Sequence, residues 1–241
     1  MIEDLSSLLC PNFYKIVPES TKDPDPIPDQ LVFAHTVYPP PAPWIVKVLN
    51  YDPINPLKST YEIKPYSKDD HSHMPIKELG LQAEENYYVY IGKERPLVVV
   101  KGIGSHWRDP LRAESVFACV AIFTFKPRHS PGFRAKTMGF GYPNFFYLPG
   151  RANGLTEESV GRFELTQPIV RRAMRRILRG KEQRPIALSG EAFALFVNHL
   201  GRFMVGKDLD AQVCLDIDRY RELVAEALRE NESGHAPAGP K

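Results

Sequence analysis

The 241-residue chain has little cysteine and no apolar run of membrane-spanning length. Cys10, Cys119 and Cys214 are too few and too scattered for a disulfide framework or a zinc knuckle. Small buried hydrophobic side chains are the better interpretation of Cys119 and Cys214. The first four residues lack the basic charges that open a secretory signal. These absences predict a soluble, cytoplasmic protein that does not engage a membrane.

The charge is nearly balanced, but its distribution is uneven. The formal net charge is +2, yet basic residues far outnumber acidic ones between residues 162 and 184, and residues 208–232 are mixed to acidic. The length fits one domain with large extensions, or two small domains.

Proline is abundant, and about half of the 23 prolines fall in the first 85 residues. Residues 23–28 and 39–43 cannot lie inside a helix and favour extended chain. Residues 30–38 and 44–50 between and after them are apolar enough to form strands. We therefore expect residues 1–85 to be an extended arm that packs on the rest of the chain or on a second subunit. A proline-motif ligand for another domain is the alternative.

Two histidines lie near carboxylates in residues 68–73. Their spacing matches no established ligand motif, and the segment offers no third ligand of suitable type. We expect a solvated loop, and we expect the protein to use no metal and no other cofactor.

Short strand-like runs dominate the middle of the chain. Residues 87–91 and 97–100 flank Gly92-Lys93-Glu94, which predicts a hairpin. Further strands are expected over residues 116–125, 144–148 and 159–165. Short strands at this density, separated by glycine and proline turns, predict a small, strongly bent antiparallel sheet or SH3-like barrel.

Helical patterns follow the strands, so the fold class is α+β. Helices are expected over residues 168–179, 191–204 and 210–230, with Ser189 as the N-cap of the second. Residues 233–241 have the composition of a disordered tail. The expected organisation is an arm at 1–85, a barrel domain at 86–206, a helix at 207–232 and the tail.

The first of these helices would place its arginines on one side. Arg171 with Arg175, and Arg172 with Arg176, have i, i+4 spacing, and no acidic residue lies among them. The pattern favours a phosphate-facing surface or an acidic protein partner. A plain solvated face is the alternative.

Three weak motifs, in order, resemble the MazF/PemK toxin family. They are Arg95-Pro96 before an apolar strand, the Gly154-Leu155-Thr156-Glu157-Glu158-Ser159-Val160 stretch with its continuation to Met174, and the helix of residues 190–204. The resemblance covers residues 87–205, about half the chain. It implies an SH3-like barrel that forms homodimers, cuts single-stranded RNA without a metal and is neutralised by an antitoxin protein.

Such cleavage needs a base for the 2′-hydroxyl, a fixed cation at the phosphorus and an acid for the leaving 5′-oxygen. Arg95 is the candidate cation, because a guanidinium forks two phosphate oxygens. The family's strand-end threonine is matched by Thr124, one residue late, so its side chain would need a bulge to reach the same face. His129 is the candidate acid or base, and His106 has the same chemistry.

Basic and aromatic residues near these positions are candidate RNA contacts. Trp107 between His106 and Arg108 offers a stacking face with cationic neighbours, although an anchored loop is an equal alternative. The full set of predicted RNA-binding residues is Lys93, His106, Trp107, Arg108, Lys126, Arg128, Arg171, Arg172, Arg175 and Arg176.

The chain also departs from the family pattern. The segment before Arg95 is only Gly92-Lys93-Glu94, shorter than the family's loop, and the arm and last helix are additions. A catalytically inactive MazF-like barrel that binds nucleic acid or protein is therefore the alternative function. A structural subunit that acts through its proline-rich arm is a third.

Overall fold

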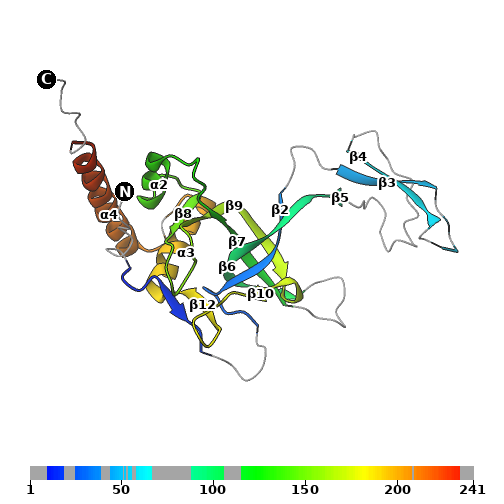
Figure 1. Ribbon diagram of the computed structural model, residues 1–241, viewed down its shortest axis with the longest axis horizontal. Coiled ribbons are helices and arrows are strands. Elements are labelled where there is room, and N and C mark those ends of the chain that lie inside the picture. Colours follow the sequence, from blue (N-terminus) through cyan, green and yellow to red (C-terminus); the bar gives the residue numbers. More distant parts are fainter. Residues whose placement is uncertain are drawn as a thin grey trace. The chain divides into compact units, whose positions relative to one another are not determined.

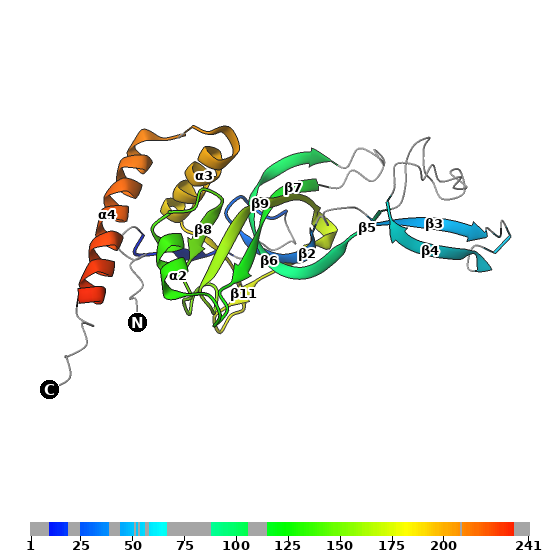
Figure 2. The same cartoon turned by 90° about the horizontal axis from the view of Figure 1, so that it is seen from above.

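The computed structural model describes residues 10–18, 25–38, 44–50, 52, 54–55, 58–66, 88–105, 115–207 and 209–233. These residues form an α+β protein whose paired strands are antiparallel (Figures 1 and 2). Within them, no helix is both long and apolar enough to cross a membrane. The predicted tail and the histidine pair of residues 68–73 lie outside the described residues.

Contacts divide the chain into two units, Met1–Ala34 with Glu94–Lys241, and His35–Lys93. The sequence-based division placed its boundary at residue 85 instead. Part of the predicted arm belongs to the larger unit, where residues 14–16 and 31–34 form strands.

The main sheet has six strands in the order β10-β2-β6-β7-β9-β8. The pairs between described strands leave β10 and β8 as its two ends, so these strands do not close a barrel. The strands are β2 (Leu31–Tyr38), β6 (Ile91–Ser105), β7 (Ser115–Thr124), β8 (Phe145–Leu148), β9 (Ser159–Val170) and β10 (Arg175–Arg176).

Two three-stranded sheets accompany it, in the orders β1-β12-β11 and β4-β3-β5. Their strands are β1 (Tyr14–Ile16), β12 (Arg184–Leu188), β11 (Leu178–Arg179), β3 (Trp44–Asn50), β4 (Thr60–Pro65) and β5 (Tyr88–Val89). The predicted strands over residues 30–38 and 44–50 are thus confirmed as β2 and β3.

The helices are α2 (Pro131–Met138), α3 (Gly190–Val205) and α4 (Ala211–Ser233). Ser189 caps α3 by accepting a hydrogen bond from the Ala192 amide, as predicted. The two C-terminal helices are confirmed. Helix α2 was not predicted; Pro131 occupies its first turn, behind the Ser130 N-cap.

The predicted hairpin around Gly92 is wrong, because β6 runs unbroken from Ile91 to Ser105. Gly92 serves a close backbone approach: a Cβ there would lie 3.1 Å from the Thr36 carbonyl oxygen. The Thr36 hydroxyl donates to the Lys93 carbonyl at 3.0 Å.

The helix predicted for residues 168–179 is also wrong. β9 continues to Val170 against β7, a 3-10 turn covers Arg171–Ala173, and the short strands β10 and β11 follow. The apolar spacing that suggested one helical face serves two cores, since Ile169 and Met174 belong to one cluster and Ile177 to the other. Pro168 is tolerated because β9 has no β8 partner beyond Arg162 among the described pairs.

The pleat of β8 divides its side chains between two helices. The ring of Phe146 contacts Phe196 of α3 at 5.0 Å, and Phe145 contacts Phe133 of α2 at 5.9 Å. In both views β8 lies between α2 and α3 (Figures 1 and 2). The α4 side chains Ile217, Tyr220 and Val224 complete this core.

The N-terminal segment is fixed to the core through Tyr14. Its hydroxyl donates to the Pro149 carbonyl at 2.8 Å, and its ring lies against Gly154, where a Cβ would approach it to 2.1 Å. Gly154 is therefore required by close packing and not by a left-handed backbone.

Replacing Gly154 should consequently destabilise the larger unit. We expect Gly154→Ala to lower the free energy of unfolding by about 1–3 kcal/mol, because the new methyl overpacks against a buried ring. Gly132→Ala is the matched control, since a Cβ there meets nothing within 4 Å and alanine favours the helix. Urea unfolding measures both, and equal midpoints for Gly154→Ala and wild type would contradict the packing.

Candidate nucleic-acid interface

Two arginines from different strands share one aromatic ring. The guanidinium carbon of Arg95, on β6, lies 4.1 Å from the ring centroid of Phe123, and that of Arg162, on β9, lies 5.0 Å from it. All three side chains are half-buried. These distances are those of a cation–π arrangement, which stabilises both guanidiniums next to the ring.

The register of the sheet explains the arrangement. β6 pairs Leu97 with Ala121, so Arg95 falls opposite Phe123, and β9 pairs Arg162 with Ala121. Side chains two residues apart in a strand point to the same face. The cluster of Arg95, Phe123, Arg162 and Phe145, which we call the Arg–Phe platform, therefore lies on one face of the main sheet.

Aromatic side chains extend the platform toward α2. Arg162 lies 5.9 Å from the Phe145 ring, which contacts Tyr142 and Phe133 at 5.4 and 5.9 Å. Lys136 lies over the Tyr142 ring at 4.7 Å. Partly exposed rings with cations beside them suit unstacked bases and their phosphates.

One carboxylate partly neutralises the positive charge of the Arg–Phe platform. Glu164 pairs with Arg162 at 2.6 Å, and both side chains are about one-third exposed. An exposed ion pair of this kind contributes little to the free energy of unfolding. Its main effect is to orient the Arg162 guanidinium.

Thr124 does not join Arg95. It follows Phe123 in β7, so its side chain points to the other face, and it pairs with Ser159. A bulge would be needed to bring it back, but the β6–β7 register shifts all lie beyond Val99, on the far side from Arg95. Thr124 and Arg95 therefore lie on opposite faces of the main sheet.

His129 lies in the turn before α2, with Lys126 and Arg128 exposed beside it. Its Nδ1 accepts a hydrogen bond from the Lys126 amide at 3.1 Å, so a neutral ring carries its proton on Nε2. The ring sits edge-on to Phe125 and Phe133, at 5.7 and 5.4 Å. His129 thus lies at the α2 end of the aromatic series that begins at the platform.

The predicted rows of arginines are not formed, because the segment is not a helix. Arg175 pairs with Glu94 at 3.0 Å and lies over Phe33, while Arg171 lies 3.8 Å from Asp25. Arg172 is exposed in the 3-10 turn and Arg176 is half-buried in β10. These side chains therefore engage different neighbours.

The remaining predicted positions are less informative. Lys93 is exposed on β6 within the smaller unit. His106, Trp107 and Arg108 lie outside the described residues. Among described residues, no group of three or more His, Cys, Asp or Glu side chains is placed to hold a metal ion. Cys119 is buried, and burial raises the pKa of its thiol to about 12.

A buried histidine positions the aromatic end of this interface. His199 of α3 is 2% exposed, and its Nε2 lies 3.1 and 3.0 Å from the carbonyl oxygens of Tyr142 and Phe145. Two carbonyl acceptors require a proton on Nε2. Burial lowers the pKa of His199 below its ordinary value, which keeps the ring neutral.

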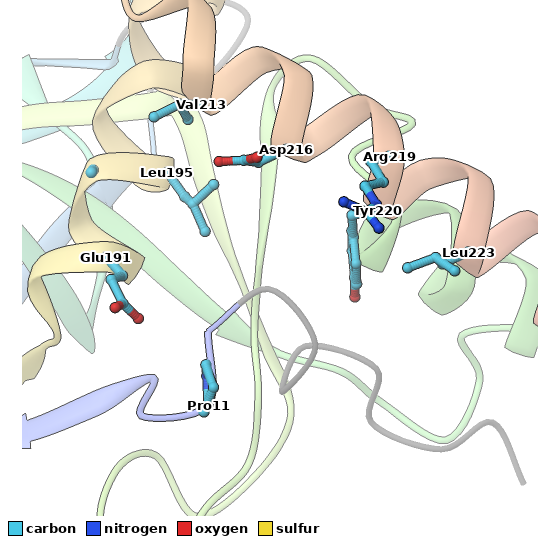
Figure 3. A pocket seen from close by; sticks show the side chains of 9 residues that line it. Pro11, Glu191, Leu195, Val213, Asp216, Arg219, Tyr220 and Leu223 are labelled. Atoms are coloured by element: carbon cyan, nitrogen blue, oxygen red, sulfur yellow. The ribbon is translucent and has the colours of Figure 1, made fainter.

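A separate cavity of about 650 Å3 lies between α3 and α4 (Figure 3). Glu191 and Leu195 reach it from α3, Asp216 and Tyr220 from α4, and Pro11 from the N-terminal segment. No residue predicted for RNA binding or catalysis lines it, so it contributes nothing to the interface.

Sequence reasoning identified Arg95 but missed Phe123, Arg162 and Phe145. Only the register of three paired strands brings these side chains together. The available signal was the opposite charges of Arg162 and Glu164, two residues apart in a predicted strand and therefore on one face.

Comparisons with protein-family models, with curated proteins and with solved structures found no match to this chain. The chemistry of the platform itself must therefore suggest a function.

The stability of the protein should fall on mild acidification because of His199. Its folded pKa is lowered, so below about pH 6.5 the unfolded chain binds a proton that the folded chain does not. The free energy of unfolding then decreases by up to about 1.4 kcal/mol per pH unit.

We expect His199→Gln to flatten this dependence between pH 7.5 and 5.5, measured by urea unfolding. His35→Gln is the control, because His35 is exposed on β2. Identical pH slopes for wild type and His199→Gln would show that the imidazole does not titrate on unfolding.

Proposed function

We propose that this protein binds single-stranded RNA across the Arg–Phe platform. The observation that carries the proposal is the pair of guanidiniums on the half-exposed ring of Phe123. A guanidinium suits phosphate oxygens, and a partly exposed ring suits the face of a base whatever its sequence. Duplex bases are already stacked and offer no such face.

Metal-independent cleavage of the bound strand is the activity that the family resemblance implies. In it the 2′-oxygen attacks phosphorus, the 5′-oxygen leaves, a base takes the 2′-hydroxyl proton and an acid protonates the 5′-oxygen. Arg95 and Arg162 suit the cationic role at the phosphate. Among the histidines that the structure describes, His129 suits proton transfer through its Nε2, since His199 is buried and His35 belongs to the smaller unit.

We further propose that the chain is a divergent relative of the MazF/PemK family. The Arg-Pro pair lies in β6, the Gly154–Val160 motif leads into β9 and α3 follows, in the order of the family motifs. An SH3-like barrel form, a homodimer and an antitoxin partner are predictions of this resemblance. A non-catalytic RNA-binding module is the alternative within the same relationship, favoured by the separation of Thr124 from Arg95.

RNA binding should depend on each platform arginine. We expect Arg95→Ala and Arg162→Ala each to weaken binding to a short single-stranded RNA and to flatten log K against log salt by about 0.7 per lost phosphate contact. Phe123→Leu keeps apolar bulk but removes the π-face, and should weaken binding by about 1–3 kcal/mol.

Fluorescence anisotropy across a salt series measures these effects. Arg229→Ala is the control, since Arg229 is exposed on α4, away from the main sheet's platform. A salt slope for Arg95→Ala and Arg162→Ala equal to that of wild type would exclude the platform as a phosphate contact.

Cleavage is tested separately. Wild type incubated with long single-stranded RNA and excess chelator should yield products with 2′,3′-cyclic phosphate and 5′-hydroxyl ends, and Arg95→Ala should be slower by about 100-fold or more. If the protein binds this RNA tightly but leaves it uncut, the nuclease hypothesis is wrong and the non-catalytic RNA-binding module is the correct alternative.

A further inference from the structure

A second cavity, of about 560 Å3, lies at the start of α2. Its polar lining comes from His129, Arg134 and Glu158, and its apolar walls include Pro127, Pro131 and Met138. A few polar groups converging among apolar walls is the usual composition of a small-ligand site.

The polar groups are arranged as one acceptor between donors. Glu158 accepts a hydrogen bond from the Tyr147 hydroxyl at 2.9 Å on Oε1 and pairs with Arg134 at 3.4 Å on Oε2. A carboxylate has about four acceptor positions, so two remain, and the side chain is 35% exposed.

Donors flank this carboxylate. Nη1 and Nη2 of Arg134 donate to Glu158 and to the Lys126 carbonyl, and each of these nitrogens carries a second N–H. When the His129 ring is neutral it carries its proton on Nε2, because Nδ1 accepts from the Lys126 amide. The cavity therefore offers a carboxylate acceptor together with N–H donors from Arg134 and His129.

Phe125 links the strand that carries the platform to the residues that line the cavity. Phe125 follows Phe123 by two residues, about 7 Å along the chain on the same face, and its amide donates to the Glu158 carbonyl at 3.0 Å. The Phe125 ring contacts His129 and Tyr147 at 5.7 and 6.2 Å. A strand lying on the platform can therefore place a neighbouring base in this cavity.

We propose that this cavity binds a guanine base, and that it gives the RNA binding proposed above its base preference. Guanine presents two adjacent N–H donors, N1–H and N2–H, which one carboxylate accepts together. Its O6 and N7 are acceptors for N–H donors. Adenine, cytosine and uracil lack the adjacent ring and exocyclic donors, and single-stranded bases are free to be read on these edges.

The test uses the full chain and three eight-residue RNAs: oligouridine, the same strand with one central guanosine, and the same strand with inosine in its place. We expect the guanosine strand to bind at least 10-fold tighter than oligouridine. Inosine lacks the N2 amino group and should lose most of that gain.

Glu158→Gln should reduce the guanosine strand to the affinity of oligouridine while leaving oligouridine unchanged. Glu157→Gln is the matched control, because Glu157 is the exposed neighbour that does not line the cavity. If Glu158→Gln melts near the assay temperature, His129→Ala replaces it, and a 3-fold or larger loss of guanosine preference is expected.

The outcomes separate this inference from the proposed function. Equal affinity for all three strands overturns the guanine site and leaves RNA binding intact. Binding of none of them overturns RNA binding, and titration with guanosine monophosphate then decides the cavity. If guanosine monophosphate binds wild type and Glu158→Gln abolishes that binding, the cavity is a guanine site for a free nucleotide. If guanosine monophosphate does not bind, the guanine site is overturned as well.

Discussion

The pleat of β7 is the constraint on which the rest of the larger unit depends. Its even-numbered apolar side chains, such as Val120 and Ile122, enter the cluster that α3 and α4 complete. Its odd-numbered side chains build a second cluster through Phe117 and Ala121 and end in Phe123 at the platform. Because one strand serves both faces, a shift of register by one residue would exchange core and surface.

The same alternation decides which chemistry the residues can share. Arg95 and Arg162 reach one ring from opposite sides of β7 in the sheet, whereas Thr124 is excluded although it is adjacent in sequence to Phe123. The platform is thus rich in positive charge and aromatic surface, and none of its four side chains can act as the base. This composition is better suited to holding an anion and a base than to moving a proton, which is why binding is the primary proposal.

Features that depend on residues near one another in the sequence could be predicted, and features that depend on pairing between distant segments could not. β7 and α3 were predictable because their apolar patterns and the Ser189 cap are local. The helix predicted over residues 168–179 failed because local spacing cannot distinguish one helical face from a chain that feeds two clusters. Arg95 was found through its neighbour Pro96, while Arg162 needed the register of β9, which depends on pairing between distant segments.

Pro168 has a consequence for how copies of the chain meet. Past Arg162, β9 pairs with β7 on one side and, among the described strands, has no partner on the other. Such a row of backbone groups is a template for edge-to-edge aggregation. Proline removes one donor from that row, and the exposed carboxylate of Glu164 adds charge near its start. Pro168 therefore helps to keep copies of the chain from adding to one another as strands.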